Sequence, residues 1–400
     1  MFFAGIRLAQ PHQRTGDSIV TCLQHSTSPL RPLSHLAHPR EVIRQFTPNW
    51  FAATMGTGVL ALALMQIGIS SLHGVAEALW WLAIVLFVVF SVLYAARWVM
   101  FFHEARQIFA HSTVSMFFGT IPMGLATILN GCLLFGINRW GEGIVPWVEA
   151  LWWFDVGLAL LCGVAIPYLM FTRQEHSIDQ MTAVWLLPVV AAEVAAASGG
   201  QLAPHLVDAH SQFLVLITSY VLWAVSLPVA FSILTILTLR MALHKLPHAN
   251  MAASSWLALG PIGTGALGML LLGADAPAIF AANGFGQLGE IARGLGLIAG
   301  IVLWGAGLWW LLTATLITLR YMRHGMPFNL GWWGFTFPLG VYTLATLKLG
   351  SWLGLVFFQH MGLVLVVALA GLWMMVASLT LRGAWRGELF VSPCIAGLNK

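Results

Sequence analysis

Ten long apolar stretches constrain this chain more than any other feature of its sequence. A helix needs about 20 apolar residues to cross a bilayer, and most of the stretches approach or exceed that length. Strand-like segments with alternating polarity are absent, so the stretches are predicted to be helices. The predicted spans are 50–69, 78–96, 113–136, 147–171, 182–200, 213–239, 252–273, 295–319, 332–347 and 352–380. The chain is therefore predicted to be an all-α polytopic membrane protein with ten transmembrane helices.

The overall composition excludes a soluble protein. Hydrophobic residues make up 59% of the 400 residues and charged residues only 8%, about a third of the share in soluble chains. The 18 Lys and Arg residues are spread thinly, without a basic run that would bind nucleic acid. The four cysteines form no CxxC pair, so neither a disulfide framework nor a metal site is expected. No cofactor is expected either.

The positive charges predict how the chain is oriented in the membrane. Fifteen of the 18 Lys and Arg residues fall on the side of the N-terminus, and only Arg139, Arg293 and Lys348 fall on the other. Cytoplasmic loops carry the excess of positive charge. We therefore expect a multi-pass protein of the plasma or inner membrane with both termini in the cytoplasm. Lys348 is assigned to a tight turn, 348–351, between the last two spans.

The two ends of the chain differ from its centre. Residues 1–45 are rich in Pro, Arg, Ser and Thr, which is typical of a disordered tail. Residues 46–382 hold all the apolar stretches and form the predicted transport domain. Residues 383–400 are predicted to be a short cytoplasmic tail.

A repeat is visible in the odd-numbered spans. Their helices are predicted to be interrupted near the middle, at positions separated by 66, 66, 73 and 77 residues. These positions are Gly56, Pro122, Pro188, Pro261 and Pro338. A period near 70 residues, with one interrupted and one straighter helix in each unit, predicts five helical hairpins.

The interruptions also predict where the odd helices lie. A Gly or Pro in a span leaves backbone carbonyls that lipid cannot satisfy, so such helices are tolerated inside protein or around a wet cavity. We expect the five odd helices to form an inner ring that lines a pore, with the even helices outside. The alternative is that these residues only allow close helix packing.

Few ionisable side chains lie inside the spans, and one of them is a candidate for function. Glu193 lies on a predicted inner helix, five residues after Pro188. It is either a packing carboxyl or a group that couples transport to protons. Asp155 and His360 lie on even helices and are interpreted as packing residues. No nucleotide-binding motif, haem histidine pair or zinc-protease motif is present, so an enzyme is not expected.

The predicted inner ring carries no positive side chain that could hold an anion by a salt bridge. Helix-end dipoles and free backbone N–H groups would attract anions weakly. Hydroxyl groups would add hydrogen-bond donors at Thr54, Thr57, Ser115, Thr120, Thr264 and Thr336. Apolar walls with these donors favour weak binding and fast passage of small anions.

Five segments resemble one known family. They are FTPNWFAATMGTGVLALAL (46–64), HSTVSMFFGTIPMGLATILNG (111–131), AVWLLPVVAAEVAAASGG (183–200), GPIGTGALGMLLLG (260–273) and GWWGFTFPLGVYTLATLKL (331–349). Together they are similar to the tellurite-resistance/dicarboxylate transporter family, from Phe46 to Arg382. That family includes bacterial tellurite-resistance proteins, fungal malate permeases and sulfite efflux pumps, and plant slow anion channels.

The resemblance implies an architecture and a gate. It implies ten helices as five hairpins in quasi-fivefold order around a pore, and three such protomers in a homotrimer. It also implies an aromatic plug from the ninth helix. The matching residue here is Phe337, with Phe335 as the fallback if the register is shifted.

The resemblance also implies a function in anion transport. The expected substrates are a C4-dicarboxylate such as malate or an oxyanion such as sulfite or tellurite. A passive channel for chloride or nitrate is the alternative within transport. A membrane sensor or scaffold that transports nothing is the alternative from a different class.

Overall fold

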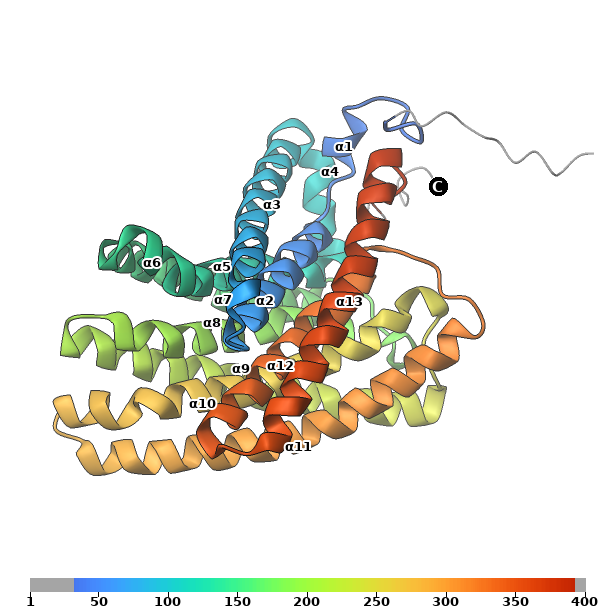
Figure 1. Ribbon diagram of the computed structural model, residues 1–400. Helices are drawn as coiled ribbons and strands as arrows, with labels where there is room; N and C mark the ends of the chain where they lie inside the picture. Colours follow the sequence, from blue (N-terminus) through green and yellow to red (C-terminus); the bar gives the residue numbers. More distant parts are fainter. Residues whose placement is uncertain (1–31, 393–400) are drawn as a thin grey trace, which may run out of the picture.

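The computed structural model describes residues 32–392, and every regular element in that range is a helix (Figure 1). Each of the ten predicted spans falls on one of these helices. The α-helices are α1 (Glu41–Arg44), α2 (Phe51–Gln66), α3 (His73–Met100), α4 (Phe102–Ala105), α5 (Thr120–Gly131), α6 (Ile137–Trp140), α7 (Val145–Thr172), α8 (Leu187–Leu202), α9 (Ala209–His244), α10 (Leu259–Ala282), α11 (Gly286–Met322), α12 (Thr336–Leu353) and α13 (Val356–Arg386). The prediction of an all-α membrane protein is confirmed.

Eight helical segments are long and apolar enough to cross a membrane within residues 32–392. The other two predicted spans correspond to α2 and α12, which have 16 and 18 residues. A 3₁₀ segment directly precedes each of these two helices. The count of ten membrane-crossing helices stays a prediction.

Five helices contact one another in a closed cycle. α2 packs against α5, α5 against α8, α8 against α10, α10 against α12, and α12 against α2. These are the odd-numbered spans of the sequence. We call them the inner helices, and α3, α7, α9, α11 and α13 the outer helices. The quasi-fivefold symmetry of the arrangement stays a prediction.

Burial separates the inner from the outer helices. In the most apolar stretch of each span, 72, 94 and 89% of the residues are buried in the spans that contain α5, α8 and α10. The same share is only 22–39% in the five outer helices. An apolar face that is exposed in the isolated chain is suited to contact with lipid. The inner helices instead meet protein on nearly all sides.

A 3₁₀ segment precedes every inner helix. These segments are Pro48–Trp50, Val114–Gly119, Ala183–Leu186, Ala249–Ala258 and Leu330–Phe335. Pro122, Pro188, Pro261 and Pro338 then lie among the first three residues of α5, α8, α10 and α12. Proline fits the first turn because it has no N–H to donate and its φ is already helical. The predicted interruptions at these prolines are therefore changes of helix type at the start of each α-helix, not breaks near its middle.

The turn between the last two long helices differs from the prediction. Lys348 and Ser351 lie inside α12, and the chain reverses at Gly354, where φ is +64°. Glycine adopts this left-handed conformation without the steric cost of a Cβ atom. The predicted turn at residues 348–351 is thus wrong by about one helical turn, and Lys348 is a helix residue.

The N-terminal segment packs on the C-terminal end of α13, and Figure 1 shows the stretch that leads into α1 beside that end. The backbone N–H groups of Leu33 and His35 donate to the carbonyls of Trp385 and Arg386, at 2.7 and 3.0 Å. The end of the predicted tail, residues 32–45, is therefore held by the rest of the fold. Most of that tail, and the last eight residues of the chain, lie outside the described residues.

Candidate functional site

A cavity of about 530 Å³ opens where the five inner helices begin. We call this cavity the vestibule. Each of the five helix starts contributes to its wall, together with the segment that follows α13. The residues that line it include Asn49, Met55, Thr113, Thr120, Val184, Leu187, Asn250, Leu257, Asn329, Gly334, Glu388, Leu389 and Val391.

The vestibule is suited to anions by its geometry. Five helical segments present their N-terminal ends to it. The first backbone N–H groups of a helix have no partner within the helix, and the helix dipole places partial positive charge at this end. Five such ends around one cavity favour a positive potential there without any basic side chain in its wall, and the carboxylate of Glu388, which also lines the cavity, opposes it.

Contacts on α12 define the direction of Phe337. Trp304 Nε1 of the outer helix α11 donates a hydrogen bond of 2.8 Å to Thr346 Oγ1. On another face of α12, Gly340 packs against Val59 of α2. Nine residues separate Phe337 from Thr346, which is a rotation of about 180° in an α-helix. Phe337 therefore points away from α11 and toward the interior of the ring, where its side chain is 3% exposed.

Phe337 also lies just beyond the vestibule. Gly334, one turn earlier, lines the vestibule wall. The bulky side chain of Phe337 thus lies on the interior face of α12, about one turn deeper than the wall of the vestibule. With this position Phe337 stays a candidate for the aromatic plug that the resemblance implies.

Phe335 has different surroundings. Its ring packs against Trp256 and Trp332, with ring centroids 5.5 and 5.7 Å away. Trp256 in turn donates a hydrogen bond of 2.8 Å from Nε1 to Thr318 Oγ1 of the outer helix α11. Phe335 thus faces the outer helices and belongs to a packed aromatic cluster. Of the two candidate gate residues, only Phe337 has the orientation that a gate requires.

Most of the candidate hydroxyl groups are engaged by the backbone. Thr57 donates to Ala53 O at 2.7 Å, Ser115 to His111 O at 2.8 Å, and Thr336 to Trp333 O at 2.8 Å. These hydroxyls, and that of Thr120, satisfy carbonyls of their own or neighbouring helices. Two others are fully buried with no partner among the described residues, namely Thr54 and Thr264. These two hydroxyl groups are therefore the candidates that could still donate a hydrogen bond.

Glu193 lies between α8, α9 and α10. Its Oε2 is 3.1 Å from the hydroxyl of Ser226 on the outer helix α9. A Cβ atom at Gly265 of α10 would lie 2.8 Å from its Oε1 and 3.0 Å from Leu227 of α9. The carboxyl group is thus in contact with an outer helix. This position explains how a carboxyl group on an inner helix can be compatible with anion passage.

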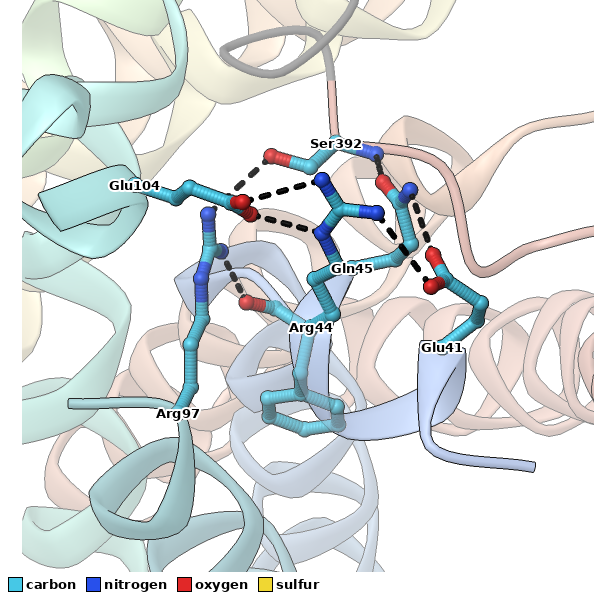
Figure 2. A network of polar contacts seen from close by, with 7 residues as sticks. Glu41, Arg44, Gln45, Arg97, Glu104 and Ser392 are labelled. Carbon is cyan, nitrogen blue, oxygen red and sulfur yellow. Dashed lines mark hydrogen bonds and ion pairs between the residues drawn. The ribbon is translucent and has the colours of Figure 1, made fainter. Parts of the chain in front are cut away.

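A buried arginine ties the two ends of the membrane domain together beside the vestibule (Figure 2). Arg97, at the end of α3, donates to the carbonyl of Phe46 and, at 3.2 Å, to Ser392 Oγ. The N–H of Ser392 donates to Gln45 Oε1 at 2.8 Å. We call Gln45, Arg97 and Ser392 the clasp. It holds the segment after α13 against the vestibule wall.

An ion pair on the surface supports the clasp. Arg44 donates to both carboxylate oxygens of Glu104, at 2.8 and 2.9 Å, and also contacts Glu41 at 3.3 Å (Figure 2). The hydrogen bond to Glu104 is the main cause that raises the pKa of Arg44 above its ordinary value. Arg44 therefore stays charged at any physiological pH.

Two features of the vestibule and the inner helices were not predicted from the sequence. The segment Glu388–Val391 lines the vestibule, although its sequence reads as a tail. Lys348 is part of an inner helix, although the turn was expected there. Helical periodicity could have placed Lys348 on the same face of the helix as Phe337, because it follows Phe337 by 11 residues, or about three turns.

A bundle of membrane-length helices whose inner members open into a vestibule is the architecture of a membrane transport protein. The comparisons with known proteins agree. Residues 45–381 match the family described as SLAC1, voltage-dependent anion channel. The chain belongs to this family of anion transporters and channels, which confirms the resemblance found in the sequence.

The relatives of this chain include proteins named as transporters of different anions. The chain is 36% identical to a sulfite efflux pump of Arthroderma otae over 87% of its own length and 93% of that protein. It is 28% identical to an uncharacterized transporter of Methanocaldococcus jannaschii over 88% of the chain and 96% of that protein. It is 23% identical to a malic acid transport protein of Schizosaccharomyces pombe over 85% of the chain and 78% of that protein.

Proposed function

We propose that this protein carries a small oxyanion, sulfite in the first place, across the membrane through the ring of inner helices. The observation that carries the proposal is the vestibule, where five helix N-termini meet in front of an inward-facing Phe337. The similarity to sulfite efflux pumps over nearly the whole chain supports sulfite as the substrate.

Phe337 is the proposed gate. An aromatic ring across a narrow path blocks ions by its bulk and by excluding water. Its displacement would open the path without any change of charge. The 3₁₀ segment before α12, with Pro338 next to the ring, gives the helix a weak point about which the ring could move.

Malate and chloride remain alternative substrates. Malate has support from the more distant malic acid transport protein. A passive channel for chloride or nitrate needs only the weak binding that the vestibule provides. We further propose that both termini are cytoplasmic, so that the vestibule faces the cytoplasm, and that the protein assembles as a homotrimer.

Flux into proteoliposomes tests the proposal. The purified protein is reconstituted and supplied with sulfite, malate, chloride or nitrate, each at two proton gradients. We expect sulfite flux above that of protein-free vesicles and above malate flux. A dependence on the proton gradient would indicate coupled transport, and its absence a channel. Vesicles with monodisperse protein that pass none of the four anions would contradict the proposal and favour a sensor or scaffold.

A further inference from the structure

Lys348 lies at the end of the ring that is opposite the vestibule. It is half-buried on α12. Eleven residues from Phe337, it is rotated by only about 20° and displaced by about 16 Å along the helix. Lys348 therefore shares the interior face of α12 with the proposed gate, and it is a positive charge that the inner ring was not expected to contain.

Electrostatic contacts agree with this direction. Both Lys348 and His205, which follows α8, act on the carboxylate of Asp275 on the inner helix α10. The ammonium group is therefore close enough to α10 for its charge to act on this carboxylate. Among the described residues, no carboxylate lies within 4.0 Å of it. Lys348 is thus a half-buried basic residue without an ion-pair partner among the described residues.

The depth of Lys348 in the ring follows from close contacts between the inner helices. A Cβ atom at Gly263 of α10 would lie 2.9 Å from Tyr342 N, and one at Gly200 of α8 would lie 3.1 Å from Leu271 Cβ. Lys348 is six residues beyond Tyr342, and Leu271 is eight residues beyond Gly263. At 1.5 Å per residue, Lys348 and Leu271 therefore differ in depth by about 3 Å. Lys348 is therefore level with the end of α8 near Gly200.

Polar side chains gather at the same depth on the facing helices. The Ser198 hydroxyl donates to Asn130 Oδ1 of α5 at 2.6 Å, and Gln201 Nε2 lies 3.5 Å from Asn130 O. The amide oxygen of Asn130 accepts the hydrogen bond from Ser198. The amide nitrogen of Asn130 is left as a donor with no acceptor among the described residues. We call Asn130, Ser198, Gln201 and Lys348 the far polar layer.

We propose that the far polar layer is a second binding site for a small oxyanion, with Lys348 as its charge and the amides of Asn130 and Gln201 as its donors. An ammonium group and amide N–H groups match the several acceptor oxygens of a sulfite-like anion. The nearby Asp275 keeps the site weak. Conduction requires such a balance, because an anion that binds too tightly does not leave. The inference rests on the proposed transport of oxyanions and names where the anion binds after the gate.

Removal of the charge tests the site. Sulfite flux is measured against sulfite concentration in proteoliposomes with the parent protein, Lys348→Gln and Lys348→Arg. Loss of one charge-assisted hydrogen bond predicts a half-saturating concentration about tenfold higher for Lys348→Gln. Lys348→Arg keeps the charge and should stay close to the parent. The matched control is Arg293→Gln, which removes an exposed charge from α11 at the same end, where Arg293 lies 5.8 Å over the Trp352 ring. It should leave the sulfite dependence unchanged.

The outcomes separate this inference from the proposed function. If the parent protein carries sulfite and Lys348→Gln has the same half-saturating concentration as the parent, the far site is wrong while transport stands. The same holds if Arg293→Gln has an effect as large as Lys348→Gln, since a general surface potential would then be responsible. If the parent carries no anion, the proposed function itself fails. Should Lys348→Gln assemble poorly, Lys348→Arg remains as a test. It keeps the positive charge, so the proposed site requires its half-saturating sulfite concentration to equal that of the parent.

Discussion

The inner helix α8 and the outer helix α7 are neighbours that are both strongly apolar, yet their surroundings differ completely. In the most apolar stretch of each span, 94% of the residues are buried in the span that contains α8, but only 28% in the span that contains α7. α8 consists largely of Ala, Gly and Val, and α7 carries large residues such as Trp147, Phe154 and Tyr168 on its exposed face. Apolar composition alone therefore does not distinguish a lipid-facing helix from a protein-facing one, but side-chain size does.

The physical reason lies in the membrane as a solvent. Lipid tails are as apolar as Leu, so burying a large side chain between helices gains little over leaving it in lipid. Helices associate by close packing instead, which requires small residues at their contacts. Inner helices should accordingly be intolerant of added volume, and outer helices should tolerate it.

The largest effect is expected from added volume in the inner ring. Gly340 of α12 packs directly against Val59 of α2, so that a larger side chain must force the two helices apart. We expect Gly340→Leu to destabilise the protein by at least about 1–3 kcal/mol and to reduce the yield of monodisperse protein. Gly371→Leu on the outer helix α13 is the matched control, because no atom lies within 4 Å of a Cβ there. Equal yields and thermal midpoints for both variants would contradict the division into inner and outer helices.

The next effect concerns the two phenylalanines near the start of α12. We expect Phe337→Ala to raise anion flux, because it removes bulk from the path, and to leave assembly largely intact. Phe335→Ala should lower stability by about 3–5 kcal/mol without raising flux, because its ring fills the cluster with Trp256 and Trp332. Flux assays paired with thermal unfolding distinguish the two. A well-assembled Phe337→Ala protein that conducts no more than the parent would exclude Phe337 as the gate.

A smaller effect is expected at the clasp. Ser392→Ala removes one hydrogen bond from the buried Arg97 guanidinium and should cost about 1–2 kcal/mol. Its control is Ser378→Ala, since the exposed Ser378 hydroxyl only donates to Met374 O of its own helix. Thermal unfolding in detergent would compare the two. Should Ser378→Ala be the more destabilising variant, the clasp would not contribute to holding the segment after α13.

The smallest effect is expected at Glu193. Its contact with Ser226 of the outer helix α9 favours a packing role over proton coupling. We expect Glu193→Gln, which keeps the shape of the side chain, to leave flux and its pH dependence unchanged. Asp155→Asn, at a buried carboxyl of the outer helix α7, serves as the control. A flatter pH profile for Glu193→Gln alone would assign proton coupling to this residue.

Much of the inner ring could be predicted from sequence. Pro122, Pro188, Pro261 and Pro338 mark the inner helices because each can occupy the first turn of an α-helix at little cost. Their exact place within the helix could not be predicted, because the 3₁₀ segments before them continue the apolar pattern of the span. The last turn was predicted at residues 348–351, where Lys348 and Ser351 interrupt the apolar pattern, but the chain reverses at Gly354.

The candidate site was only partly predictable. The resemblance implied Phe337 as the gate, with Phe335 as the fallback, and the sequence offered Glu193 as a carboxyl on an inner helix. Which face of a helix meets the ring interior depends on its contacts with helices far away in sequence. Those contacts, such as Thr346 with Trp304 and Glu193 with Ser226, exist only in the folded protein.

The sequence by itself determined the all-helical membrane fold and the alternation of inner and outer helices, because hydropathy and the positions of Gly and Pro are local properties. The tertiary structure decided the rest. In it, Phe337 faces the ring interior and Phe335 faces the outer helices. Lys348 lies on the inner face of α12 rather than in a turn, and Gln45, Arg97 and Ser392 come together in the clasp. The reason is that helical periodicity fixes the angles between side chains on one helix, but only packing against the other helices fixes the direction in which that helix is rotated.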